Sequence, residues 1–127
     1  MKISDLPIST LAYIGDAVYE LKIRLAILRT QKAKAGIVHK EVIQLVNAKA
    51  QAEALERIFP SLSGFESSLV KRASNHPVPQ ARNVDQAEYR QATGFEALIG
   101  YTYLANDEDR LLSLLRKAQP DLIFKKL

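Results

Sequence analysis

Two stretches of this chain contain only one charged residue each, and both have the pattern of a helix. Asp16 is the only charged residue from Leu6 to Tyr19, and Glu96 is the only one from Gln91 to Asn106. Apolar residues recur at helical spacing in both stretches, and the chain lacks the alternating β-branched runs that indicate strands. Helices with so little charge must pack against other elements, so the sequence predicts an all-α helical bundle.

Start and stop signals place the helices of this bundle in a single domain over residues 1–127. The predicted helices run from the Pro7–Ser9 start signals to about Arg29, and over about Ile37–Asn47, Ala48–Phe59, Glu66–Ser74, Gln86–Ala105 and Asp107 to just before Pro120. The second and third are either one bent helix or two helices. Prolines exclude a helix between Asn75 and Asp85. Residues 119–127 have no clear pattern and form a possible flexible tail.

Composition restricts the classes of partner and site. The 127 residues carry a net charge of +4, a mild bias toward polyanions, nucleic acid first. The chain has no cysteine, which excludes disulfides and thiolate metal sites and fits a reducing cytoplasm. No signal-peptide pattern and no uncharged stretch of membrane-spanning length is present, so we expect a cytoplasmic protein without a membrane partner.

The two isolated acids are the main candidates for chemistry. The helix around Asp16 is apolar nearly all round, so we expect it to be central, with Asp16 inside a second packed face. Glycine inside a helix costs about 1 kcal/mol relative to alanine. Close packing of the two acid helices would explain Gly15, Gly94 and Gly100.

No base lies one helical turn from either acid, and buried carboxylates need compensation. Two carboxylates brought together would suit Mg²⁺, which prefers oxygen ligands and keeps several waters. The alternative is that Asp16 and Glu96 are separate acids, each paired with a distant base such as Lys49 or Arg90.

The amino-acid sequences of both stretches resemble motifs of a known family. The segment Leu11-Ala12-Tyr13-Ile14-Gly15-Asp16-Ala17-Val18-Tyr19-Glu20 resembles the signature helix of ribonuclease III domains, which carries a catalytic Asp. The segment from Ala92 to Leu104 resembles the second signature, in which a catalytic Glu is followed by Ala-Leu. With Asn47-Ala48-Lys49-Ala50-Gln51-Ala52 between them, the motifs look most like Mini-ribonuclease III, over about Leu6 to Ala118.

The resemblance implies a fold, an activity and partners. It implies a homodimeric ribonuclease III-type domain without a double-stranded RNA-binding domain, whose signature helices meet at the two-fold axis. Asp16 and Glu96 would be both catalytic residues and ligands of Mg²⁺, for which Mn²⁺ could substitute. The implied substrate is double-stranded RNA, notably the ends of precursor 23S ribosomal RNA, and a ribosomal protein is a possible helper.

This chain departs from the family at several positions. Larger ribonuclease III enzymes carry further acids where this chain has Ser9, Ala12 and Thr93. Mini-ribonuclease III has an Arg-Gly-Arg-Asn-type motif where this chain reads Lys71-Arg72-Ala73-Ser74-Asn75-His76. The first departure implies a metal shell with more water, and the second leaves one arginine and the asparagine of the family's loop motif in place.

Candidate RNA-binding residues follow from the chemistry of A-form RNA, which is recognised largely through phosphates and 2′-hydroxyls. The group around the proline loop is Lys71, Arg72, Asn75, His76, Arg82 and Asn83. The second group, in the motif between the two signatures, is Lys49 and Gln51. Two other functions remain open: a non-catalytic double-stranded RNA-binding module, and a helical scaffold or ribosome-assembly partner.

Overall fold

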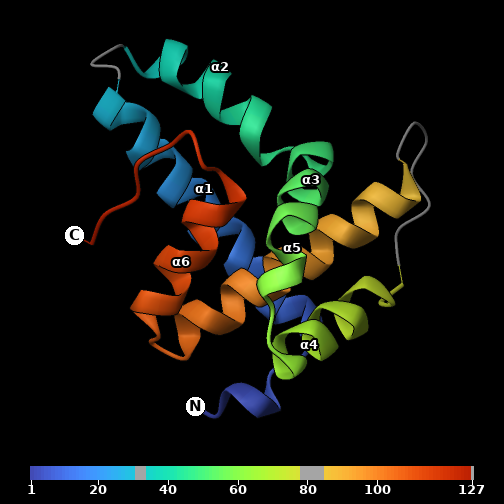
Figure 1. Ribbon diagram of the computed structural model, residues 1–127. Helices are drawn as coiled ribbons and strands as arrows, with labels where there is room; N and C mark the ends of the chain where they lie inside the picture. Colours follow the sequence, from blue (N-terminus) through green and yellow to red (C-terminus); the bar gives the residue numbers. More distant parts are fainter. Residues whose placement is uncertain (31–33, 78–84, 127) are drawn as a thin grey trace.

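The computed structural model describes residues 1–30, 34–77 and 85–126, and this part of the chain is built from helices without strands. The helices are α1 (Ile8–Thr30), α2 (Ala35–Val46), α3 (Ala48–Ile58), α4 (Gly64–Ser74), α5 (Gln86–Leu104) and α6 (Glu108–Ala118), with short 3₁₀ turns η1 (Ile3–Asp5) and η2 (Phe59–Ser61) (Figure 1). The all-α prediction is confirmed, and each predicted helix is present.

Side-chain caps determine where several helices begin. The Asn47 side chain accepts a hydrogen bond of 2.8 Å from the Ala50 amide, so α3 is a separate helix that starts after a bend. Ser63 and Glu66 form a capping box at the start of α4. Asp85 and Asp107 cap α5 and α6 in the same manner as Asn47, by accepting from a main-chain amide of the first turn.

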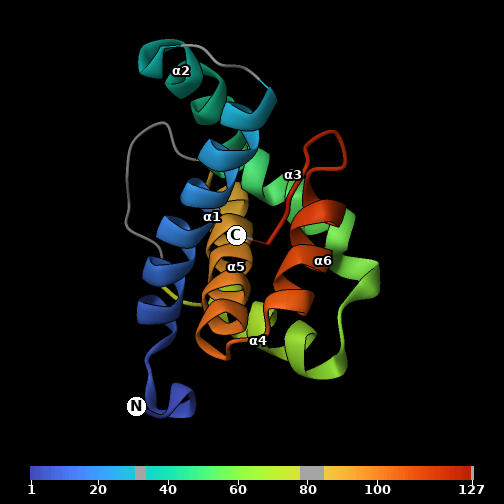
Figure 2. The same cartoon turned by 90° about the vertical axis from the view of Figure 1, so that its left-hand side faces the viewer.

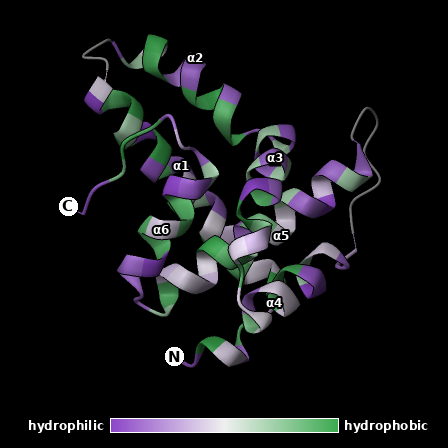
Figure 3. Cartoon of the chain, in the orientation of Figure 1, coloured by the Kyte–Doolittle hydropathy of each residue, from purple (hydrophilic) through white to green (hydrophobic). Residues whose placement is uncertain are grey.

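Helix α5 is the centre of the bundle, because it packs against α1, α3, α4 and α6 (Figures 1 and 2). Phe95, Leu98 and Ile99 in its middle are completely buried. Its first turns are hydrophilic and extend beyond the other helices (Figure 3). The part of α5 that carries Glu96 therefore lies where the core meets the surface.

The expectation that the Asp16 helix is central was wrong. Helix α1 packs one face on α5, while no other helix of the described residues covers its opposite side (Figure 2). Tyr13, Leu21 and Leu28 on that side are 77%, 53% and 50% exposed. Asp16 is also exposed, and not inside a second packed face. The hydropathy pattern identified the apolar residues of α1. It did not show which of them are buried by other helices of the same chain.

Glycines allow α1 and α5 to touch along their main chains. A Cβ atom on Gly15 would overlap the Glu96 carbonyl oxygen, and one on Gly100 would overlap the Leu11 carbonyl oxygen. Gly94 serves another contact, since its Cβ would lie 2.6 Å from the Ser74 hydroxyl of α4. The close-packing prediction is thus confirmed for Gly15 and Gly100 and was wrong for Gly94.

The chain after α6 folds back onto the bundle. Phe124 is only 3% exposed and belongs to the main core. The Arg116 guanidinium donates a hydrogen bond of 2.9 Å to the Phe124 carbonyl oxygen. In the described residues, no helix is both long enough and apolar enough to cross a membrane.

Candidate active site

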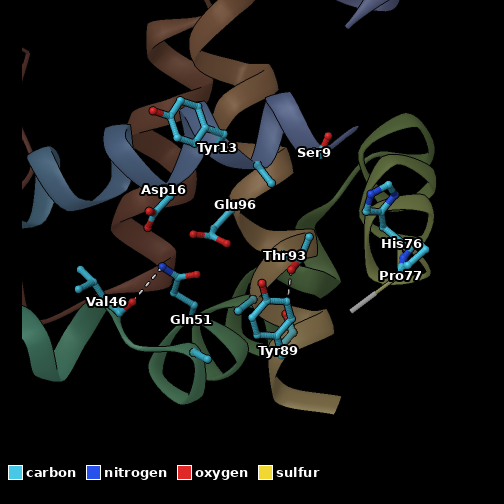
Figure 4. Close-up of a pocket in the computed structure, with 13 residues that line it drawn as sticks. Ser9, Tyr13, Asp16, Val46, Gln51, His76, Pro77, Tyr89, Thr93 and Glu96 are labelled. Carbon is cyan, nitrogen blue, oxygen red and sulfur yellow. Dashed lines mark hydrogen bonds between the residues drawn. The ribbon is translucent and has the colours of Figure 1, made fainter. Parts of the chain in front are cut away.

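Helices α1 and α5 each present one row of side chains to the same pocket of about 480 Å³ (Figure 4). The row on α1 is Ser9, Ala12, Tyr13 and Asp16, and the row on α5 is Tyr89, Ala92, Thr93 and Glu96. The two rows have the same spacing, and each ends in the acid. Helical periodicity and the contact of α1 with α5 together bring the two carboxylates face to face.

The two acids affect each other electrostatically. Burial is the largest cause that raises the pKa of Glu96, and the nearby Asp16 adds to it through a hydrogen bond and its charge. The Gln51 side chain opposes the rise, and together these effects raise the pKa of Glu96 to about 8. A carboxylate that faces another carboxylate in a partly buried position is unstable in its ionised form unless a proton or a cation neutralises it. The acid pair therefore requires a proton or a cation to neutralise it.

Bases of the described part of the chain do not neutralise this pair. Lys49 and Arg90, the alternative partners considered from sequence, are both exposed. Neither forms an ion pair with Asp16 or Glu96, and the ion pairs of the described residues involve other acids. The interpretation of two separate, base-paired acids is thus not supported for Lys49 or Arg90.

Gln51, predicted together with Lys49 as an RNA contact, lies beneath the acids and is buried. It is 2% exposed, and its amide nitrogen donates a hydrogen bond of 3.1 Å to the Val46 carbonyl oxygen (Figure 4). Lys49, predicted in the same group, lines a different hollow formed by α2, α3 and the chain after α6. The two residues point to different sides of α3 because they are two positions apart in a helix.

The structure separates the predicted loop residues. His76 lines the acid pocket, whereas Lys71 and Asn75 line a neighbouring hollow between α3, α4 and α5. Arg72 is exposed on α4. Arg82 and Asn83 lie outside the residues that the structure describes.

Two tyrosines of the pocket were not among the predicted site residues. Tyr13 and Tyr89 contribute their rings to the pocket wall, one from each acid helix. Tyr13 precedes Asp16 by about one helical turn, and Tyr89 precedes Glu96 by about two turns. Helical spacing relative to each acid would have indicated both residues.

The pocket fits a hard divalent cation that keeps much of its water. Mg²⁺ can be held by one or two carboxylates while the rest of its octahedral shell is water or phosphate oxygen. In the described part of the chain, no three His, Cys, Asp or Glu residues come close enough to enclose a metal completely. Asp16 and Glu96 therefore suit an open, hydrated site more than a closed structural one.

Comparison with known proteins gives a consistent result. The model of the ribonuclease III domain matches residues 9–107, which include both acid rows. The chain is 45% identical to Mini-ribonuclease 3 of Thermoanaerobacter sp. strain X514 over 83% of this chain and 75% of that protein. It is 40% identical to Mini-ribonuclease 3 of Symbiobacterium thermophilum over 89% of this chain and 88% of that protein.

A solved structure agrees with these sequence matches. A crystal structure of a protein from Fusobacterium nucleatum superposes with a TM-score of 0.81 at 32% identity, covering 90% of this chain and 92% of that one. The helical fold, the acid pair and the matched residues lead to one assignment: the chain belongs to the ribonuclease III domain family and, within it, to the Mini-ribonuclease 3 group.

Proposed function

We propose that this ribonuclease III-type endoribonuclease hydrolyses phosphodiesters in double-stranded RNA at the Asp16–Glu96 pocket, with Mg²⁺ as cofactor. The single observation that supports this best is the pair of facing carboxylates in an open pocket, without a neutralising base among the described residues. Such a pair attracts a divalent cation, and a cation bound there lies within reach of an RNA strand on the surface.

Asp16 and Glu96 would hold Mg²⁺, with Mn²⁺ as a substitute that accepts the same oxygen ligands. When bound, the cation would lower the pKa of water and neutralise charge that develops on the phosphate. Tyr13, Tyr89 and His76 line the same pocket and can donate hydrogen bonds to phosphate oxygens or 2′-hydroxyls. We expect 5′-phosphate and 3′-hydroxyl products, as the family resemblance implies.

The uncovered side of α1 supports a homodimer. Tyr13, Ala17, Leu21 and Leu28 are exposed and follow one another at helical spacing along one stripe. Arg24, which is paired with Glu20, is exposed on the same face between Leu21 and Leu28. Exposed apolar side chains grouped along one helix face are typical of a protein interface. Two copies related by a two-fold axis along this stripe would place two acid pockets in one particle, one for each strand of a duplex.

The natural substrate that we propose is the helix formed by the ends of precursor 23S ribosomal RNA in the cytoplasm, with a ribosomal protein as helper. The resemblance to Mini-ribonuclease III is the support for this part. His76 lines the acid pocket, Lys71 and Asn75 line the hollow between α3, α4 and α5, and Arg72 is exposed on α4. These four residues can contact the backbone of such a duplex. Lys49 faces another side and would contact RNA only if the duplex extends around α3.

Cleavage of a defined RNA duplex tests this function. Wild type, Asp16→Asn, Glu96→Gln and the exposed control Asp121→Asn are incubated with the duplex in Mg²⁺, Mn²⁺ or EDTA. We expect wild type and Asp121→Asn to cut with either metal, and the two site variants to lose activity by at least about 100-fold. Cleavage that persists in EDTA would overturn the metal role, and a wild type that binds the duplex without cutting it would favour the non-catalytic RNA-binding alternative.

A further inference from the structure

Gln51 lies at the junction of the acid pocket and the bend between α2 and α3. It is 2% exposed, although an amide side chain loses several hydrogen bonds with water when it is buried. Burial of this side chain therefore requires partners inside the protein, and the partners it has are informative.

One partner of Gln51 belongs to the main chain and the other to the acid pair. The amide nitrogen donates a hydrogen bond of 3.1 Å to the Val46 carbonyl oxygen at the end of α2. The same side chain faces the Glu96 carboxylate across the pocket, near enough to oppose the rise of the pKa of that acid. Figure 4 shows Asp16, Glu96 and Gln51 directed toward one another from α1, α5 and α3.

The surroundings of Gln51 restrain it in this position. The Asn47 side chain caps α3 one turn earlier, with a hydrogen bond of 2.8 Å from the Ala50 amide. Ala52, Ala54 and Leu55, which follow Gln51 on α3, are buried in the bundle. The amide is therefore presented from a fixed helix turn, not from a mobile surface.

We propose that Gln51 is a positioning residue that orients the Glu96 carboxylate toward Asp16 for divalent-metal binding. The hydrogen bond to Val46 restrains the Gln51 amide, and the amide in turn restrains the acid. Partners of this kind around a metal ligand typically change metal affinity by about 10- to 100-fold. The inference rests on the proposed metal-dependent function.

Calorimetric titration of Mn²⁺ into the purified full chain tests the inference without an activity assay. The variants are Gln51→Met, which keeps the length and apolar volume but has no hydrogen-bonding amide, and Gln51→Asn, which keeps the amide but shortens its reach. Gln44→Met changes an exposed glutamine of α2 and is the matched control. Asp16→Asn removes one of the two proposed ligands, so the Mn²⁺ binding that this variant loses is the binding at the acid pocket.

We expect the Kd for Mn²⁺ to rise at least about 10-fold in both Gln51 variants and to stay unchanged in Gln44→Met. Cleavage of the duplex by Gln51→Met should recover when the metal concentration is raised by a similar factor, with the KM for RNA unchanged. Recovery by metal separates a positioning role from a damaged fold, because added metal would not restore a misfolded protein.

The outcomes distinguish the two proposals. If wild type binds Mn²⁺ at the acid pocket and both Gln51 variants bind it equally well, Gln51 is a packing residue and this inference is wrong. If wild type and Asp16→Asn bind Mn²⁺ alike, the metal site itself is wrong and the proposed function fails with it. A Gln51→Met variant that binds Mn²⁺ normally but has a lowered Tm would also assign Gln51 to structure alone.

Discussion

Gly15 is so close to Glu96 that a Cβ atom at position 15 would overlap the main-chain carbonyl oxygen of residue 96. The glycine precedes one acid, and the carbonyl belongs to the other. The contact that brings α1 and α5 together is thus the same contact that sets the separation of the two carboxylates. Changes at this crossing should affect stability and the acid pair together.

Gly15→Ala should destabilise the protein severely. The added methyl group meets main-chain atoms, which cannot rotate away, so α1 must shift relative to α5. We expect a loss of about 3 kcal/mol in the free energy of unfolding, measured by urea denaturation. Gly36→Ala is the control, because no atom lies within 4 Å of its added Cβ. This control should be neutral or stabilising by up to about 1 kcal/mol, since alanine is the better helix former. Equal effects of the two substitutions would contradict the main-chain contact.

The pKa of Glu96 predicts how the stability of the metal-free protein depends on pH. Its folded-state pKa of about 8 lies above the ordinary value of 4.5, so between these values the folded protein holds a proton that the unfolded chain has lost. The free energy of unfolding should therefore fall as the pH rises from about 4.5 to about 8. Glu96→Gln has no carboxyl group at this position, so its stability should not fall in this way. In EDTA, the difference in Tm between Glu96→Gln and wild type should therefore increase by several degrees, in favour of the variant, from pH 5 to pH 8.

The same experiment in Mg²⁺ provides the comparison. A cation that binds the folded protein stabilises it and competes with the proton on Glu96. We expect wild type, but not Glu96→Gln, to regain Tm at pH 8 when Mg²⁺ replaces EDTA. Parallel Tm curves of the two proteins across the pH range in EDTA would show that burial and Asp16 do not shift the pKa of Glu96.

Arg110 connects α6 to α4 through a carboxylate, and its removal should be costly. Its guanidinium donates two hydrogen bonds to Glu66, of 2.9 and 2.7 Å, and one of 3.0 Å to the Ser61 carbonyl oxygen. Arg110→Met leaves the buried Glu66 without this partner, so we expect a loss of about 2 kcal/mol at neutral pH in urea denaturation. Lys126→Met removes the exposed ion pair with Asp109 and should leave stability nearly unchanged, because solvent screens a pair of this kind.

The same ion pair predicts a distinct response to acid. The hydrogen bond from Arg110 lowers the pKa of Glu66 below the ordinary 4.5. The stability that the Arg110–Glu66 ion pair contributes is fully present above the ordinary pKa of 4.5 and is lost as the pH falls through the folded-state pKa of Glu66. Wild type should therefore lose stability relative to Arg110→Met below about pH 4.5. An unchanged difference between the two proteins from pH 7 to pH 3 would contradict this role.

Leu21→Glu should disrupt the proposed dimer. Leu21 is 53% exposed in the middle of the apolar stripe on α1, where a charge would be buried between two copies. We expect sedimentation velocity to show a dimer for wild type and a monomer for the variant at micromolar concentration. Phe59→Glu is the control, because Phe59 is 42% exposed on η2, away from the stripe. A wild type that sediments as a monomer would contradict the dimer.

Helices, acids and glycines were predictable because their signals are local. Asp16 and Glu96 are isolated in stretches that otherwise lack charge, and helical spacing determines which neighbours share their face. Gln51 was selected by its place in the Asn47–Ala52 motif, which does not reveal that its side chain is buried. Its burial results from the packing of α3 beside α5, which no local pattern encodes.

The sequence by itself determined that the chain is all-helical, that two acids interrupt two nearly uncharged helices, and that glycines permit close approach. Each of these follows from residue chemistry and helical period. Only the tertiary structure decided that α5 and not α1 is central, that Gly94 serves α4, and that Gln51 lies beneath the acids while Lys49 faces another side. The physical reason is that an apolar helix surface indicates that another element will bury it, whereas the identity of that element depends on how all the helices pack together.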